Sequence, residues 1–253
     1  MNMKKIIYSL MVCCGLVAFA SCEKKVTTED PSTITYYVSF EMNGDETMLV
    51  PINSTFTDPG VAATENGADV NDKVVVTITD AASREVPAIS TTAAGMYTIS
   101  YSAVNKDGFG SETSRKVFVY DPAITKSIAG TYSVDVTQTI YGSNPFSAYI
   151  AANGWATSAK VVVTEVAPGF FKFDDLLAGW YGQIRGYGNS YYMSGTVTLN
   201  ADNSLTLLES YIKGWGDGLD WIKNAVWDEI NSTIKYDASY AGSIKISPVL
   251  VKQ

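Results

Sequence analysis

The stretch MYTISYSAVNKDGFGSETSRKVFVYD, Met96 to Asp121, carries the clearest fold signal in the sequence. Two runs rich in Tyr, Ile, Val and Thr flank Asn105-Lys106-Asp107-Gly108, whose residue types favour a turn. Apolar and polar residues alternate along both runs, which is the period of a half-buried strand. The stretch therefore predicts a β-hairpin.

Similar runs lie upstream, at ITYYVSF (34–40) and KVVVTIT (73–79), and no amphipathic helix interrupts them. Short strands separated by turn residues at this spacing favour two packed antiparallel sheets. We therefore predict a β-sandwich for residues 33–122. The boundary is expected at Asp121-Pro122, because proline restricts its own backbone and that of its predecessor.

Beyond this boundary a second set of strand patterns begins. The clearest are SIAGTYSVDVTQTIYG (127–142), KVVVTEVAPGFFKFDD (160–175), SGTVTLNADNSLTLLES (194–210) and TIKYDASYAGSIKISPVLVK (233–252). The segment GLDWIKNAVWDEI (218–230) is ambiguous, because its apolar residues suit both a helix and a hairpin; we expect mostly strand with one helical turn. Residues 123–253 are thus predicted to form a second all-β domain.

The N-terminus predicts export and lipidation. Lys4 and Lys5 precede an apolar run that is too short to span a bilayer, which is the layout of a secretory signal. The small residues before Cys22 resemble a bacterial lipobox. We expect a lipoprotein signal peptide at residues 1–21, a lipidated cysteine at Cys22 and a polar tether over residues 22–32.

Composition excludes several classes of function. The formal net charge is −8, which disfavours nucleic acid and anionic lipid as partners. The chain has no histidine, and its three cysteines all lie in residues 1–22. Ser-His and Cys-His catalysis, imidazole or thiolate metal sites and disulfides are therefore not expected. Carboxylates alone could support glycoside hydrolysis, but they are expected in turns and at solvated edges. We predict no enzyme, no cofactor and no metal.

Aromatic residues are concentrated in the second half: all five tryptophans follow Pro122. Several lie among glycines, as in GWYGQIRGYGNSYYMSG (179–195) and Gly214-Trp215-Gly216. Rings in glycine-rich loops suit a sugar, whose C–H face stacks on an aromatic plate while polar side chains bind its hydroxyls. The alternative is that these rings fill the core. The predicted contact rings and hydrogen-bonding residues are Trp180, Tyr187, Trp215 and Trp221, with Arg185, Asp217 and Asp220.

Two stretches of the first domain resemble bacterial immunoglobulin-like modules. STFTDPGVAATENGADV (54–70) resembles the opening of such a repeat. AGMYTISYSAVNKDGFG (94–110) resembles its end, with Tyr97 placed as in a tyrosine corner and Ile99 where antibody domains have cysteine. The resemblance implies an Ig-like β-sandwich.

IAGTY (128–132), the FKFDDL passage (171–176) and the terminal VLVK (249–252) resemble calycin-like barrels and the C-terminal domains of surface lipoproteins of glycan-foraging bacteria. The resemblance implies an all-β protein in which an Ig-like β-sandwich precedes an antiparallel β-barrel-like domain.

It also implies a non-catalytic lipoprotein at the cell surface, anchored in the outer membrane by lipid only. The expected ligand is a polysaccharide or oligosaccharide, and the expected partner is an outer-membrane transporter complex for glycan uptake. The alternative is a structural or adhesion module that binds another envelope protein.

Overall fold

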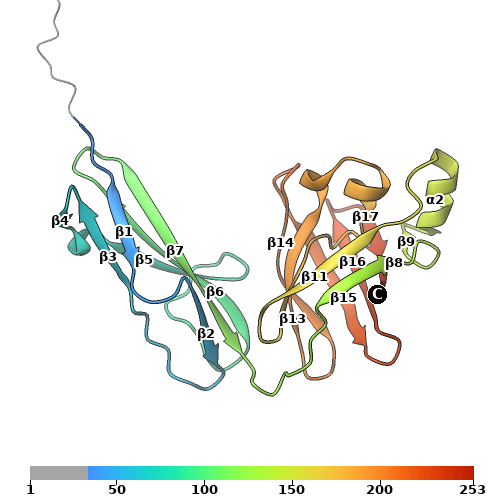
Figure 1. The fold of residues 1–253 in the computed structure, drawn as a ribbon, viewed down its shortest axis with the longest axis horizontal. Helices are drawn as coiled ribbons and strands as arrows, with labels where there is room; N and C mark the ends of the chain where they lie inside the picture. Colours follow the sequence, from blue (N-terminus) through green and yellow to red (C-terminus); the bar gives the residue numbers. More distant parts are fainter. Residues whose placement is uncertain (1–33) are drawn as a thin grey trace, which may run out of the picture. The chain divides into compact units, whose positions relative to one another are not determined.

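The computed structural model describes residues 34–253 (Figure 1). The predicted signal peptide, the tether and Cys22 lie outside the described residues. The described chain is mostly β-strand, as predicted. Within it, the helices fall short of the length and apolar character that a bilayer crossing demands.

The first domain is a β-sandwich, as its strand pattern predicts. Its strands are β1 (Val38–Met42), β2 (Thr47–Pro51), β3 (Val61–Glu65), β4 (Ala68–Asp69), β5 (Val75–Asp80), β6 (Gly95–Val104) and β7 (Gly110–Tyr120). One sheet has the order β1-β3-β4, and the other has the order β2-β7-β6-β5. Only the β2–β7 pair is parallel. The hairpin predicted around residues 105–108 is β6–β7, which pairs from Gly95↔Val119 to Val104↔Gly110.

Two features of the Ig-like resemblance have a structural counterpart. The Tyr97 hydroxyl donates to the Ser90 carbonyl at 3.3 Å, which is the contact of a tyrosine corner. Asp58, in the Asp-Pro-Gly-Val element, forms an ion pair with the fully buried Arg115 at 2.6 Å. Its carboxylate also accepts a hydrogen bond from the Tyr101 hydroxyl at 2.6 Å. This element is therefore fastened to β6 and β7 by a buried polar network.

The second domain is an antiparallel barrel (Figure 1). Its strands are β8 (Gly130–Val134), β9 (Ile140–Tyr141), β10 (Asn144–Pro145), β11 (Lys160–Ala167), β12 (Phe170–Phe173), β13 (Met193–Leu199), β14 (Leu205–Ile212), β15 (Leu219–Asp228), β16 (Thr233–Tyr240), β17 (Ile244–Ser247) and β18 (Val249–Lys252). The ladder runs from β16 through β18, β8, β11, β12 and β13 to β14, while β15 pairs with β16. The bridges Ile212↔Asp217 and Ser204↔Val226 join the β14 and β15 sides and close the ring.

The ambiguous segment 218–230 is a strand, β15, whose ladder with β16 is interrupted by two register shifts. The helical turn expected there does not form, because β15 has β16 as a ladder partner and its bulges absorb the irregular apolar spacing. The last pattern forms three strands rather than two, because Pro248, which cannot donate to a ladder, separates β17 from β18.

Two helical segments were not predicted: α2 (Phe146–Asn153) and the π-helix η2 (Trp180–Ile184). Both contribute to the barrel core, α2 through Phe146 and Ile150 and η2 through Trp180 and Ile184. Two short 3-10 turns, η1 (Asn71–Lys73) and η3 (Asn189–Tyr191), complete the helices of the described chain.

Candidate functional site

Three connections lie at one end of the barrel: β12 to β13 through η2 and η3, β14 to β15, and β16 to β17. Within the first connection, η2 follows Gly179, which has a left-handed backbone (φ 73°). A Cβ atom at Gly179 would also lie 2.5 Å from the Cβ of Ala159, so only glycine fits here. The helix η2 begins directly after this tight turn, and its first two residues are Trp180 and Tyr181.

The two glycine-rich loops meet at this end of the barrel. The Gly214 amide of the β14–β15 connection donates to the Ser190 carbonyl in η3 at 2.7 Å. A Cβ atom at Gly214 would come within 2.5 Å of the Tyr191 ring, so the absence of a side chain permits this approach. The next residue, Trp215, places its ring 4.8 Å from that of Tyr191.

A cavity of about 400 Å³ opens between these loops. It is lined by Tyr181, Arg185, Tyr187, Trp215, Asp217, Tyr240 and Ile244. Tyr181 and Tyr240 are 5% and 4% exposed and form its floor. Tyr187 and Trp215 are 44% and 43% exposed and form its rim. We call this feature the aromatic cavity.

The rings of the aromatic cavity support one another. Trp215 stacks on Tyr240 with centroids 5.9 Å apart and meets the edge of Tyr181 at 4.7 Å. Tyr187 lies 6.0 Å from Tyr181. Such contacts stabilise each ring beyond the area it buries and hold it in one orientation. The cavity wall is therefore preformed.

The Arg185 guanidinium packs against the faces of three aromatic rings. Its guanidinium carbon lies 4.8 Å from the Tyr187 centroid, 5.3 Å from that of Trp155 and 5.5 Å from that of Tyr181. Its Nε atom is buried and has no hydrogen-bond partner among the described residues. The arrangement fixes a positive charge in the cavity wall.

Asp217 supplies the second charged group of the cavity wall. Its Oδ1 atom accepts a hydrogen bond from the Tyr240 hydroxyl at 2.9 Å. Burial and this hydrogen bond raise the pKa of Tyr240, and burial raises the pKa of Tyr181 to about 12. Both phenols therefore keep their protons at neutral pH and can act as donors.

Four of the residues predicted as the ligand site gather at the aromatic cavity: Arg185, Tyr187, Trp215 and Asp217. Trp180 does not. It is 2% exposed, and its ring stacks on Tyr141 at 4.6 Å and packs against Phe146 at 4.5 Å. The expectation that Trp180 is a surface contact is therefore wrong, because η2 turns this ring into the barrel core.

Asp220 and Trp221 do not line the aromatic cavity either. The Asp220 carboxylate accepts hydrogen bonds from the Ser239 hydroxyl at 2.8 Å and the Gly242 amide at 2.9 Å. The Trp221 ring lies 4.6 Å from the ammonium groups of both Lys223 and Lys245. The register shift between Leu219 and Trp221 explains the separation, because a bulge changes the face to which following side chains point.

Three lining residues were missed: Tyr181, Tyr240 and Ile244. Tyr181 lies inside the glycine-rich stretch 179–195, directly after Trp180. Tyr240 follows the buried Tyr236 and Ala238 at intervals of two, which places it on the inner face of β16. This alternation was the signal that could have identified Tyr240.

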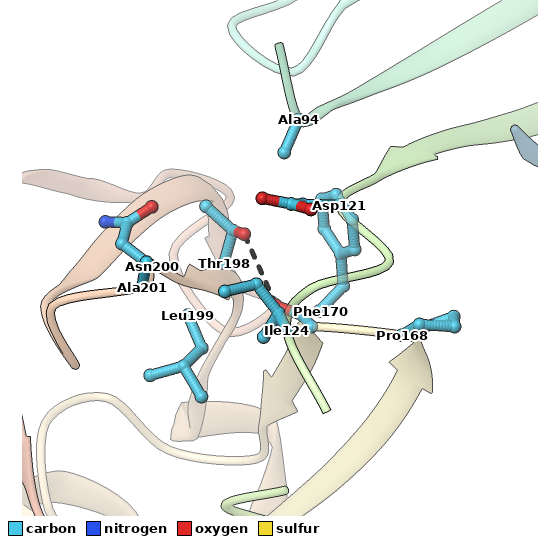
Figure 2. A pocket seen from close by; sticks show the side chains of 10 residues that line it. Ala94, Asp121, Ile124, Pro168, Phe170, Thr198, Leu199, Asn200 and Ala201 are labelled. Carbon is cyan, nitrogen blue, oxygen red and sulfur yellow. Dashed lines mark hydrogen bonds between the residues drawn. The ribbon is translucent and has the colours of Figure 1, made fainter. Parts of the chain in front are cut away.

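A second hollow, of about 80 Å³, lies beside the β11–β12 turn (Figure 2). Figure 2 shows Ile124, Phe170 and Leu199 in its wall and the hydrogen bond from the Thr198 hydroxyl to the Gly169 carbonyl. Its small size and mainly apolar wall offer little to a polar ligand. In residues 34–253, no three acidic, histidine or cysteine side chains gather closely enough to hold a metal ion.

Comparisons with known proteins agree with the two-part architecture. A family model for a bacterial surface protein Ig-like domain matches residues 40–119. A second model, which describes a C-terminal domain, matches residues 121–252. The crystal structure of the lipoprotein BT2262 from Bacteroides thetaiotaomicron is 32% identical, with 86% of this chain and 100% of that chain covered and a TM-score of 0.44.

A search of curated proteins finds no match. The family models confirm the predicted order of an Ig-like domain followed by a second β domain. The second model alone spans more than half of the 253 residues. The chain therefore belongs to the family that this C-terminal domain defines, and carries that domain after an Ig-like domain of bacterial surface proteins.

Proposed function

We propose that this surface-associated envelope protein binds an extracellular saccharide in the aromatic cavity and performs no chemistry on it. The observation that carries the proposal is the cavity itself: two exposed rings at the rim, Tyr187 and Trp215, above two buried tyrosines. A volume of about 400 Å³ lies within the usual size of small-ligand pockets.

The side chains of the cavity suit the two kinds of surface that a sugar presents. The apolar C–H face of a pyranose can stack on the exposed Trp215 or Tyr187 ring. Hydroxyl groups can donate to the Asp217 carboxylate, of which Oδ2 forms no hydrogen bond with a described residue. The Tyr181 hydroxyl adds a neutral donor, because its pKa is raised to about 12 by burial.

The test is a titration of the mature protein with a panel of oligosaccharides, comparing Trp215→Ala with Trp221→Ala. Loss of one stacking ring at an interface costs about 1–4 kcal/mol of binding free energy, which is about 5- to 1,000-fold in affinity. Trp215→Ala should show such a loss, whereas Trp221→Ala, a matched change outside the cavity, should not. Equal effects of the two variants, or no binding by the wild type, would contradict the proposal.

The location we propose is the outer membrane, with lipid on Cys22 as the anchor and a transporter complex for glycan uptake as the partner. The support is the signal-like N-terminus, the surface-protein family of the first domain and the likeness to a Bacteroides lipoprotein. A non-catalytic binding protein held beside a transporter would raise the local concentration of its ligand.

The alternative function, adhesion to another envelope protein, has one observation in its favour. Strand β5 is an edge of its sheet and exposes Val75 and Val76 at 61% and 51%. Exposed apolar edge strands can pair with a strand of another protein. If this edge is the main binding surface, Val76→Lys should abolish cross-linking to an envelope protein, and Trp215→Ala should leave the cross-link intact.

A further inference from the structure

Arg185 differs from the other two arginines of the chain in having no acidic partner. Arg84 pairs with Asp80 at 2.7 Å, and Arg115 pairs with Asp58 at 2.6 Å. The Arg185 side chain forms no salt bridge and no hydrogen bond with any residue of the described chain. A protein with 26 acidic residues and a net charge of −8 thus leaves one guanidinium unpaired, inside its aromatic cavity.

The aromatic rings around Arg185 satisfy only part of its bonding capacity. Rings at 4.8 to 5.5 Å attract the cation through their faces. They do not accept the N–H groups, which lie in the plane of the guanidinium and form a fork that fits two oxygens of a carboxylate. The Nε donor is already buried and lacks an acceptor. The structure thus fixes the guanidinium, and the donors that it leaves for a ligand are those of the two Nη atoms.

Asp217 is the other charged residue of the cavity wall, and it does not neutralise Arg185. The two side chains form no ion pair within 4.0 Å, and Asp217 instead accepts the Tyr240 hydroxyl. One wall of the cavity therefore offers a cation with free donors, and another offers an acceptor suited to hydroxyls. A ligand with a carboxylate at one point and hydroxyls at another matches both.

We infer that the saccharide bound in the aromatic cavity is acidic, a uronic-acid-containing glycan whose carboxylate is bound by Arg185. The inference rests on the proposed saccharide function. Arginine rather than lysine suits this role, since its fork binds a carboxylate through two parallel hydrogen bonds while its face remains stacked on aromatic rings.

The decisive comparison uses glycans that differ only in the carboxyl group. Oligogalacturonides, alginate oligosaccharides and glucuronate-containing oligosaccharides are titrated beside their methyl esters, which keep the backbone but lose the charge. For at least one acidic glycan, esterification should weaken binding to the wild type about tenfold or more, because charge-assisted hydrogen bonds are about twice as strong as neutral ones. Raised salt should weaken binding of that acid but not of its ester.

Two variants assign the effect to Arg185. Arg185→Gln should bind the acid and the ester equally, and Arg185→Lys, which keeps the charge without the fork, should show an intermediate preference. Thermal melts of both variants measure whether they are folded. The acid–ester comparison on the wild type tests the acidic ligand even if Arg185→Gln does not fold.

The outcomes separate this inference from the function on which it rests. Binding of neutral cello-, xylo-, manno- or malto-oligosaccharides with no preference for any acid over its ester would overturn the acidic ligand and leave saccharide binding in place. No binding of any saccharide, acidic or neutral, would remove both. An acid preference that persists in a folded Arg185→Gln variant would assign the carboxylate to another residue and contradict the role of Arg185.

Discussion

Trp180 and Trp215 both contact several other rings of the barrel domain, yet their surroundings differ. Trp180 is 2% exposed and contacts four rings of the barrel core: Tyr141, Phe146, Tyr149 and Trp155. Trp215 is 43% exposed on a hairpin tip. The first therefore acts in stability, and the second is available to a ligand.

This difference predicts opposite outcomes for two alanine substitutions. Trp180→Ala should reduce the free energy of unfolding by about 3–5 kcal/mol, because it leaves a large cavity in the core. Trp215→Ala should reduce it by less than half as much and should act mainly on saccharide binding. Urea denaturation of both variants measures the first quantity. A stability loss at Trp215 equal to that at Trp180 would assign both rings to the core.

Asp175 is a fully buried carboxyl among apolar side chains. It accepts backbone hydrogen bonds from Leu177, Gly179 and Met193, at 2.9, 3.2 and 3.2 Å. Burial nevertheless raises its pKa from 3.8 to about 7, against the effect of these bonds. The Asp175 carboxyl therefore joins the turn that precedes η2 to Met193, the first residue of β13.

The raised pKa of Asp175 predicts a specific pH dependence. Between about pH 4 and 7 the folded protein holds a proton that the unfolded chain has lost, so stability should fall as the pH rises through this window. Asp175→Asn cannot ionise and should lack this component, which denaturation at pH 5 and pH 8 would measure. Carboxylates with lowered pKa, such as Asp135 with its Thr137 hydrogen bond, act below about pH 4 and do not obscure it. Identical pH profiles of wild type and variant would contradict the assignment.

At the scale of elements, the aromatic cavity depends on the contact between two loops at Gly214. Gly214→Ala should push the Tyr191 ring aside, because the new methyl group would lie 2.5 Å from it. Tyr191 contacts both rim rings, Trp215 and Tyr187, so the rim should shift with it. We expect a loss of about 1–3 kcal/mol in stability and weaker saccharide binding.

The matched control is Gly110→Ala, because a Cβ atom there meets nothing within 4 Å and the backbone needs no left-handed conformation. This control should leave both stability and binding nearly unchanged. Unaltered binding in Gly214→Ala would mean that the rim does not depend on the contact between the loops.

Hairpins were the elements most easily predicted from the sequence. The pairs β6–β7, β11–β12 and β13–β14 combine alternating apolar residues with a turn rich in Gly, Asn or Pro, so local residues suffice to specify them. The helices α2 and η2 were not predictable in this way. Segment α2 has no side-chain cap at its N-terminus, and η2 is a single irregular turn fixed by its packing in the barrel.

The same limit applies to the candidate site. Glycine-flanked rings located the two loops, and four of the seven chosen ligand residues line the cavity. The π-helix decides which of the adjacent rings Trp180 and Tyr181 lines the cavity, and no sequence period encodes that choice. The bulge in β15 likewise moved Asp220 and Trp221 away from the cavity.

For the whole molecule, attachment to the membrane is expected to depend on Cys22 alone. Cys22→Ala removes the proposed acceptor for the lipid, and each buried methylene of an acyl chain contributes about 0.8 kcal/mol to membrane binding. The variant should therefore move from the membrane fraction to the soluble fraction when cells are fractionated. Its saccharide affinity should equal that of the wild type, since the aromatic cavity lies at residues 181–244. Unchanged membrane association would contradict the anchor.

If the molecule divides near Asp121-Pro122, as its sequence predicts, the second domain should fold and bind without the first. The main core cluster of the barrel draws its buried residues only from Ile128 to Leu250, and the main core cluster of the sandwich draws its own only from Val50 to Val119. A fragment of residues 121–253 keeps the Asp121 carbonyl, which accepts the Ile124 amide at 3.0 Å, and every residue of the cavity wall.

This fragment should unfold in one cooperative transition and bind the saccharide with the affinity of the full chain, because the main core of the barrel is contained within residues 128–250. The fragment of residues 33–122 should fold but should not bind. Thermal melts and parallel saccharide titrations of both fragments measure these outcomes. A fragment of residues 121–253 that melts without cooperativity, beside a stable full chain, would show that the sandwich is needed to complete the barrel.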